Sequence, residues 1–94
     1  MIIELERNGV AVELMFGKTY LDITVTPAYA SSVFTDEQNT DICDDVSGNI
    51  KRLAGVYENE LASEHNLSST YIDVASKLIG YMLRSMGYVI KSTI

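Results

Sequence analysis

The chain has 94 residues and a net charge of −6, with 13 acidic side chains against 7 basic ones. Its length fits one domain, residues 1–94, and 47% apolar with 21% charged residues indicates a globular rather than a disordered chain. An acidic balance works against attraction to nucleic acid and to anionic membranes, and it favours a partner protein with a basic surface.

The acidic residues are concentrated in the first two thirds of the chain. Residues 1–65 hold twelve acidic and four basic residues, whereas residues 66–94 hold one acidic and three basic residues. Charged residues interrupt the first nine positions, so we expect neither a signal peptide nor a membrane span there. Cys43 is the only cysteine and cannot form an internal disulfide, which favours a reducing, cytoplasmic location.

The dipeptide Asn8-Gly9 lies between two apolar-rich runs and predicts a tight hairpin turn. Both residue types tolerate the positive φ that a type I′ turn requires. The turn predicts three facing pairs: Arg7 with Val10, Leu5 with Val12, and Ile3 with Leu14. A slip of one residue would mix apolar with acidic side chains on each face, so the pattern supports this register.

Gly17-Lys18 has the form of a second two-residue loop, with glycine first as in a type II′ turn. Pairing outward from this loop predicts Leu14 opposite Leu21, Val12 opposite Ile23, and Val10 opposite Val25. These pairs share the face chosen by the first hairpin, and Pro27 then ends the strand because it lacks an N–H donor. The sequence therefore predicts a three-stranded antiparallel meander with one buried face.

The same registers place carboxylates on the opposite face of the meander. Glu4, Glu13 and Asp22 are expected side by side across the three strands, with Glu6 beside them. An apolar cluster is expected at one end of this face, formed by Ile2, Met15 and Tyr20. Three interpretations remain open: a solvated face, a binding face for a basic partner, or a divalent-cation site without the Asp-rich loop that calcium sites use.

A long helix is predicted from about Asp36 to His65, where apolar residues recur at helical spacing. Thr35 and Gln38 resemble a capping box at its start, and residues 28–40 otherwise give no clear pattern. Acidic residues crowd the first turns: Asp36, Glu37, Asp41, Asp44 and Asp45. The helix dipole favours anions there, so helix stability explains them, and a ligand-binding acidic patch is the alternative.

Gly48 and Gly55 lie seven residues apart in this helix, close to one face. Each costs about 1 kcal/mol relative to alanine in a helix interior, which suggests that another helix or chain packs closely against them. The chain also has six tyrosines and more apolar residues than one sheet face and two helix stripes require. We therefore expect a homodimer.

A second helix is predicted to begin at Ser68, with Leu67 and Ile72 placed for a hydrophobic staple. Its apolar stripe contains methionines and reads as core: Ile72, Ala75, Leu78, Ile79, Met82, Leu83 and Met86. Gly87 stands where a left-handed C-cap is expected. Residues 88–90 are compatible with a short edge strand.

Residues 58–77 carry a pattern of small and apolar residues around a turn. The pattern consists of Ala62, Asn66 at the turn, Leu67, Ile72 and Ala75. It resembles a helix-turn-helix, which would imply a DNA-binding regulator that acts as a dimer. The sequence departs from that family at His65, normally apolar, and offers Ser69, Thr70 and Asp73 to the groove. Base recognition relies on Arg, Lys, Asn or Gln, so this set of side chains argues against nucleic acid as a partner.

Catalytic motifs are not found in the sequence. His65 is the only histidine, so zinc-ligand spacing is missing, and Cys43 falls on an apolar helical stripe as a buried thiol would. In one straight helix these two residues would be about 33 Å apart, too far for a nucleophile and its base. Phosphate-binding glycine loops and nucleophile elbows are also missing. We expect no enzymatic activity, no cofactor and no metal.

We expect an α+β fold in which a three-stranded antiparallel meander is followed by two helices packed on one sheet face. The expected function is non-enzymatic protein binding through the acidic surface. In size and charge the chain is similar to small acidic phage proteins that inhibit nucleic-acid-handling host machinery, a likeness of composition. The candidate partner-binding residues are Glu4, Glu6, Glu13, Asp22, Tyr20, Met15, Asp41, Asp44 and Asp45.

Overall fold

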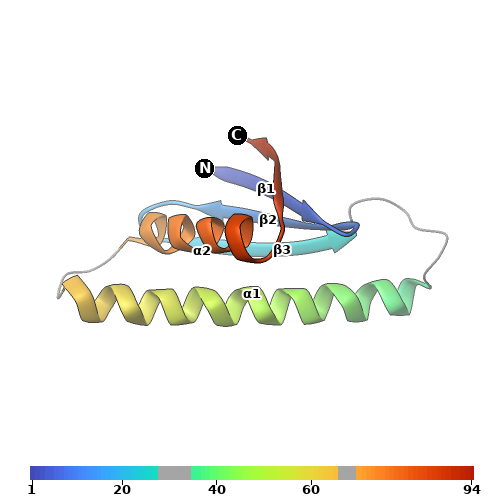
Figure 1. Ribbon diagram of the computed structural model, residues 1–94, viewed down its shortest axis with the longest axis horizontal. Helices are drawn as coiled ribbons and strands as arrows, with labels where there is room; N and C mark the ends of the chain where they lie inside the picture. The colour runs from blue at the N-terminus through green and yellow to red at the C-terminus, as the bar shows by residue number, and fades with distance from the viewer. Residues whose placement is uncertain (28–34, 66–69) are drawn as a thin grey trace.

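The computed structural model describes residues 1–27, 35–65 and 70–94 (Figure 1). Its elements are β1 (Ile2–Arg7), β2 (Val10–Phe16), β3 (Leu21–Pro27), α1 (Asp36–His65), α2 (Tyr71–Ser85) and β4 (Val89–Thr93). The strands form one antiparallel sheet in the order β3-β2-β1-β4. The α+β fold predicted from the sequence is confirmed, with a meander first, then two helices, and a fourth strand at the C-terminus.

The first hairpin has the predicted register. Arg7 pairs with Val10, and the ladder continues through to Ile2 opposite Met15. Asn8 and Gly9 have φ values of 51° and 77°, the left-handed conformation that a type I′ turn needs at both central positions. The local turn chemistry thus determines which residues of β1 and β2 share a face.

The second hairpin differs from the prediction by two residues. Phe16 pairs with Leu21, which leaves a four-residue loop in place of the two-residue loop expected at Gly17-Lys18. The Gly17 N–H donates to the Tyr20 carbonyl oxygen at 3.0 Å, and a Cβ at Gly17 would lie 2.6 Å from the Tyr20 ring. Glycine leaves space for the Tyr20 ring at this position, and its φ is not positive. An even shift keeps every side chain on its predicted face.

A contact far along the chain helps to hold this longer loop. The Lys18 carbonyl oxygen accepts a hydrogen bond of 3.2 Å from the N–H of Tyr71, the first residue of α2. Local sequence cannot reveal such a contact, because it joins residues more than fifty positions apart.

α1 begins with the predicted capping box. The Thr35 N–H donates to Gln38 Oε1 at 2.8 Å, and the Gln38 N–H donates to Thr35 Oγ1 at 3.1 Å. With 30 residues the helix is about 45 Å long, roughly twice the length of a seven-residue strand. It therefore extends past the sheet at both ends (Figure 1).

α2 begins after Thr70, whose backbone N–H and hydroxyl both donate to Asp73 Oδ2, at 3.2 and 3.0 Å. The predicted start at Ser68 and the staple partner Leu67 lie outside the described residues. The helix ends as predicted, with Gly87 at a φ of 79°. The chain then turns into β4, which is longer than the predicted strand and pairs antiparallel with β1.

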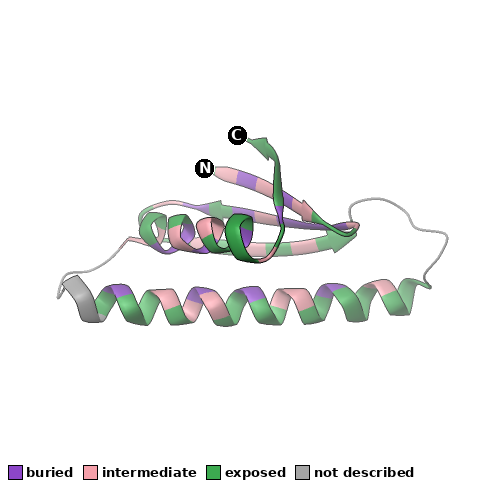
Figure 2. Ribbon diagram, viewed as in Figure 1, coloured by how far each residue is buried: buried purple, intermediate pink, exposed green. Residues whose placement is uncertain are grey.

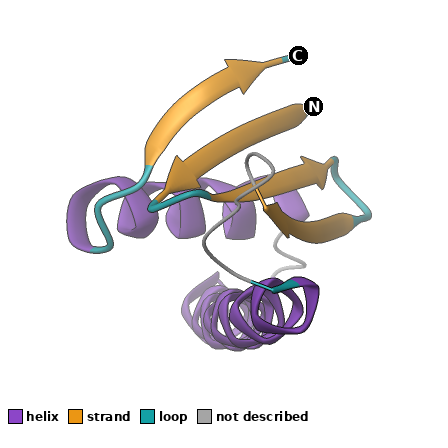
Figure 3. Cartoon of the chain, turned by 90° about the vertical axis from the view of Figure 1, so that its right-hand side faces the viewer, coloured by secondary structure: helices purple, strands orange, loops and turns teal. Residues whose placement is uncertain are grey.

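The core lies between the inner sheet face and the two helices (Figures 2 and 3). Its buried members are Ile3, Leu5, Val12, Leu14 and Phe16 from the sheet, Ile50, Ala54 and Leu61 from α1, Val74, Ala75, Leu78 and Met82 from α2, and Tyr88. Ile3, Leu5, Val12 and Leu14 lie on the face predicted to be buried, whereas Leu21, Ile23 and Val25, predicted on the same face, are only partly buried. Both helices therefore cover one face of the sheet, and no helix of the described residues covers the other.

Candidate functional site

The sheet face turned away from the helices carries the carboxylates of β1, β2 and β3. We call it the acidic sheet face, defined by Glu4, Glu6, Glu13 and Asp22. Glu4 and Glu13 are directly opposite each other, and both are half-buried. Ser92 pairs with Glu4 on one side and Thr24 pairs with Glu13 on the other, so polar residues flank the two carboxylates across the four strands. Like charges directly opposite in a sheet repel, and a cation would relieve that repulsion.

Asp22 is not where the sequence pattern placed it. Because the second hairpin has a longer loop, Asp22 is opposite Met15, and Thr24 takes the position beside Glu13. The predicted row of three adjacent carboxylates is therefore wrong, and Asp22 lies one side-chain row away from the Glu4–Glu13 pair. Met15, 37% exposed, stands between Ile2 and Asp22 in that second row.

Tyr20 does not join Met15 and Ile2 in an apolar cluster. It is 44% exposed and lines a hollow of about 570 Å³ together with inner-face residues Ile3 and Phe16 and with Ile72 of α2. The four-residue loop turns its ring toward Gly17 and this hollow. The predicted apolar cluster is thus divided between the two sides of the sheet.

Sequence reasoning missed the cation at the acidic sheet face. Lys91 Nζ lies 4.0 Å from Glu6 Oε2, with both side chains at least partly exposed. The ladder between β1 and β4 changes register between Glu4 and Leu5, so β4 has an extra residue at this point. No local signal could have found this pair, since it depends on where β4 docks and where its register shifts.

The candidate residues Asp41, Asp44 and Asp45 belong to a different part of the molecule. All three are exposed on the first third of α1. Figure 2 shows this end of the helix mostly exposed, where it extends beyond the sheet. The structure therefore does not bring the helix acids together with Glu4 and Glu13 in a single site, and the acidic surface has two separate regions.

Cys43 is a free, buried thiol on α1, as its position on the helical stripe predicts. Burial raises the pKa of this thiol above its ordinary value of 9.0, and the neighbouring Asp44 carboxylate raises it further. A nucleophilic cysteine needs the opposite shift. α1 is continuous from Cys43 to His65, which separates their backbones by about 33 Å.

The segment that resembles a helix-turn-helix is built into the α1–α2 contact. Lys77 Nζ lies 3.9 Å from Glu60 Oε2, and the Tyr71 hydroxyl donates to Glu58 Oε1 at 3.3 Å. Asp73 caps the start of α2 through Thr70. The turn residues at positions 66–69 lie outside the described residues. Of the polar side chains that the resemblance would offer to DNA, Thr70 and Asp73 thus contact each other, and Ser69 lies outside the described residues.

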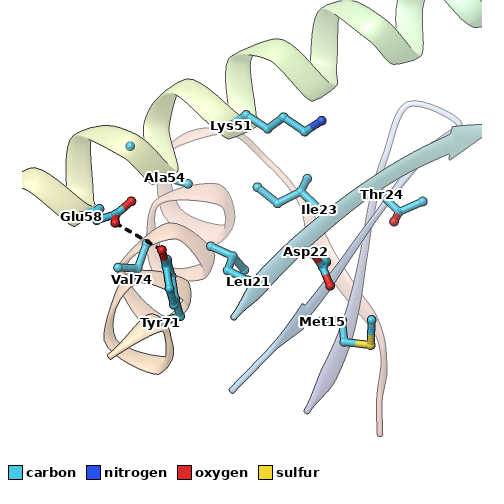
Figure 4. Close-up of a pocket in the computed structure, with 11 residues that line it drawn as sticks. Met15, Leu21, Asp22, Ile23, Thr24, Lys51, Ala54, Glu58, Tyr71 and Val74 are labelled. Carbon is cyan, nitrogen blue, oxygen red and sulfur yellow. Dashed lines mark hydrogen bonds between the residues drawn. The ribbon is translucent and has the colours of Figure 1, made fainter. Parts of the chain in front are cut away.

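A groove separates β3 from α1, and its volume is about 630 Å³ (Figure 4). One wall is the edge strand β3, with residues 21–24, and the other is α1, with Lys51, Ala54, Gly55 and Glu58. Tyr71 and Val74 of α2 close one end. Carboxylates therefore lie on both walls, Asp22 on the strand and Glu58 on the helix. We call this feature the β3–α1 groove.

Within residues 1–27, 35–65 and 70–94, no group of three or more histidine, cysteine or carboxylate side chains could hold a metal ion. None of the helices, over their described residues, is both long and apolar enough to cross a membrane. Comparison of the chain with protein families, with curated proteins and with solved structures finds no match.

Proposed function

We propose that this protein is a non-enzymatic protein-binding module whose acidic sheet face engages a basic site on a partner protein. The observation that carries the proposal is the directly opposed, half-buried pair Glu4 and Glu13. The fold tolerates repulsion between these carboxylates of some tenths of a kcal/mol. A lysine or arginine from a partner would convert that repulsion into two attractive contacts. The basic site of a nucleic-acid-binding protein has the matching charge.

The test is capture of partners from cell extract with the immobilised protein, with and without nuclease treatment. The informative variant is Glu4→Gln/Glu13→Gln, which removes two charges and keeps the side-chain size. The matched control is Asp41→Asn/Asp44→Asn, which removes the same charge from the exposed end of α1. A basic protein retained by the wild type and the control, and lost by the sheet variant, supports the proposal.

Two results would contradict the proposal. Equal loss of the retained protein by both double variants would mean that net charge alone causes retention. Loss of the retained protein on nuclease treatment would mean that nucleic acid bridges the two. Retention should also weaken steeply as salt rises, because exposed charges are screened over about 8 Å at physiological ionic strength.

A homodimer is part of the proposal, and so is a reducing cytoplasmic location for the free Cys43. The close contact expected at Gly48 and Gly55 is not made within the described chain, since a Cβ built on either glycine meets nothing from another element within 4 Å, and the proposed dimer interface lies instead on α2 and β4. Apolar side chains also remain exposed on α2 and β4, namely Ile72, Leu83, Val89 and Ile90. Multi-angle light scattering at high micromolar concentration should give the mass of two chains, and a monomer mass would exclude the dimer.

A further inference from the structure

β3 is an edge strand, and its apolar residues are only half-buried. β2 pairs with one edge of β3 over all seven residues, and no described strand pairs with the other edge. Val12 and Leu14 in β2 are fully buried, whereas Ile23 and Val25, their partners in β3, are partly exposed. Another strand beside β3 would complete the burial of these side chains and would pair with the N–H and C=O groups on the edge that no described strand occupies.

α1 runs alongside this open edge and leaves room for an extended chain. The β3–α1 groove has a volume of about 630 Å³, within the range of protein ligand sites. Gly55 is on the helix wall of the groove, and a Cβ built there meets nothing within 4 Å. Gly48 is equally open but does not line the groove. Because Gly55 has no side chain, space remains in the groove. The absence of a side chain at Gly48 has no such effect, since Gly48 lies outside the groove.

The charges around the groove favour a cationic ligand. Asp22 and Glu58 contribute carboxylates from the two walls, and Lys51 contributes one ammonium group. The Tyr71 hydroxyl donates to Glu58 Oε1 at 3.3 Å and holds that carboxylate at the groove wall (Figure 4). Along β3, Asp22 and Thr24 alternate with the apolar Leu21 and Ile23. A strand added beside β3 would alternate in the same way, with apolar side chains inward and outward side chains next to Asp22.

We propose that an extended segment of the partner protein, with apolar residues alternating with lysine or arginine, binds along β3 as an added strand in the β3–α1 groove. This inference rests on the proposed function, because it assigns a further segment of the same basic partner to the groove that adjoins the acidic sheet face at Asp22. Main-chain hydrogen bonds to β3 supply affinity, and the alternating side chains supply specificity.

The probe is a fluorescein-labelled peptide, acetyl-Lys-Val-Arg-Val-Lys-Val-amide, titrated by fluorescence anisotropy against the whole chain. The Gly55→Leu variant places a side chain in the groove, and the matched control Gly48→Leu places the same side chain on the open face outside it. Both variants keep α1 because leucine favours a helix more than glycine does, which circular dichroism verifies. Gly55→Leu is expected to weaken binding at least about tenfold, and Gly48→Leu less than about twofold. Equal affinity of the two variants would overturn the proposal.

Two N-methylated peptides test whether the probe binds as a strand. One carries N-methyl groups on its valines and the other on its lysines and arginine. In an antiparallel pair, alternate residues direct their N–H groups toward the neighbouring strand. One peptide is therefore expected to lose binding and the other to keep it. Equal binding of the two methylated peptides would show that charge alone attracts the probe, and would overturn strand addition.

Failure of the groove can be distinguished from failure of the proposed function. If probe binding is unchanged in Gly55→Leu and lost in Glu4→Gln/Glu13→Gln, the acidic sheet face binds cations and the groove proposal is wrong. If the wild type does not bind the probe at about 1 mM, the groove proposal is also wrong, and capture of a basic partner through Glu4 and Glu13 decides the proposed function separately. If capture fails as well, both proposals are wrong.

Discussion

The two faces of the sheet are built from the same strands but differ in the side chains they carry. The inner face presents Leu5, Val12 and Leu14, all fully buried under the helices, while the outer face, which no described helix covers, places Glu4 opposite Glu13. Burial of apolar area stabilises the fold on one face, and like-charge repulsion slightly destabilises it on the other. Because like charges on the outer face destabilise the isolated chain, binding of an opposite charge there would remove this repulsion.

The largest expected difference between the faces is in stability, and neighbouring residues of β2 can measure it. Leu14→Ala should lower the free energy of unfolding by about 2–5 kcal/mol, because it removes a fully buried side chain and leaves a cavity. Met15→Ala, on the outer face and 37% exposed, should cost less than about 1 kcal/mol. Urea denaturation measures both. Similar losses would mean that the outer face is also covered.

The assignment of residues to faces depends on the first turn, and a glycine substitution there should have an intermediate effect. Gly9→Ala should lower the free energy of unfolding by about 1–2 kcal/mol, because alanine is strained at a φ of 77°. The same substitution at Gly48 should raise it by up to about 1 kcal/mol, since that position is helical and open. Shifts of the denaturation midpoint in opposite directions for the two variants would confirm this prediction. Shifts in the same direction would contradict it.

Alkaline pH should destabilise the fold through Tyr88, whose side chain is buried in the core. Burial raises the pKa of the Tyr88 phenol above its ordinary value of 10.0, an effect only partly offset by Arg7. The folded state therefore holds this proton more tightly than the unfolded state. The contribution of this proton to the free energy of unfolding is fully present below pH 10 and is lost as the pH rises through the folded-state pKa. Between pH 9 and 11.5 the melting temperature should fall more steeply for the wild type than for Tyr88→Phe. Parallel curves for the two proteins would contradict this prediction.

The smallest expected effect belongs to the acidic sheet face. Glu4→Gln/Glu13→Gln should raise the free energy of unfolding by some tenths of a kcal/mol, because it removes the repulsion between opposite carboxylates. The gain should shrink in high salt, which screens the repulsion in the wild type. Chemical denaturation at two salt concentrations measures it. A clear loss of stability at low salt would mean that these carboxylates support the fold.

Local patterns in the sequence were sufficient for most of the architecture. Asn8-Gly9 predicts the first turn and its register, because few residue types adopt positive φ at two successive positions. Thr35 and Gln38 predict the start of α1, and Gly87 predicts the end of α2, because both signals act within one helical turn. Period-two alternation then identifies the buried sheet face even where the second register is shifted.

The candidate site required contacts between distant parts of the chain. The second register depends on a loop in which Tyr20 packs on Gly17 and Lys18 bonds to Tyr71, and it moves Asp22 away from Glu13. The Lys91–Glu6 pair depends on the bulged docking of β4. The β3–α1 groove exists because α1 lies beside an edge strand and has glycine at position 55. Turns and caps are local and short-range, whereas the rows of charge on a sheet and the space beside its edge follow from how the elements pack.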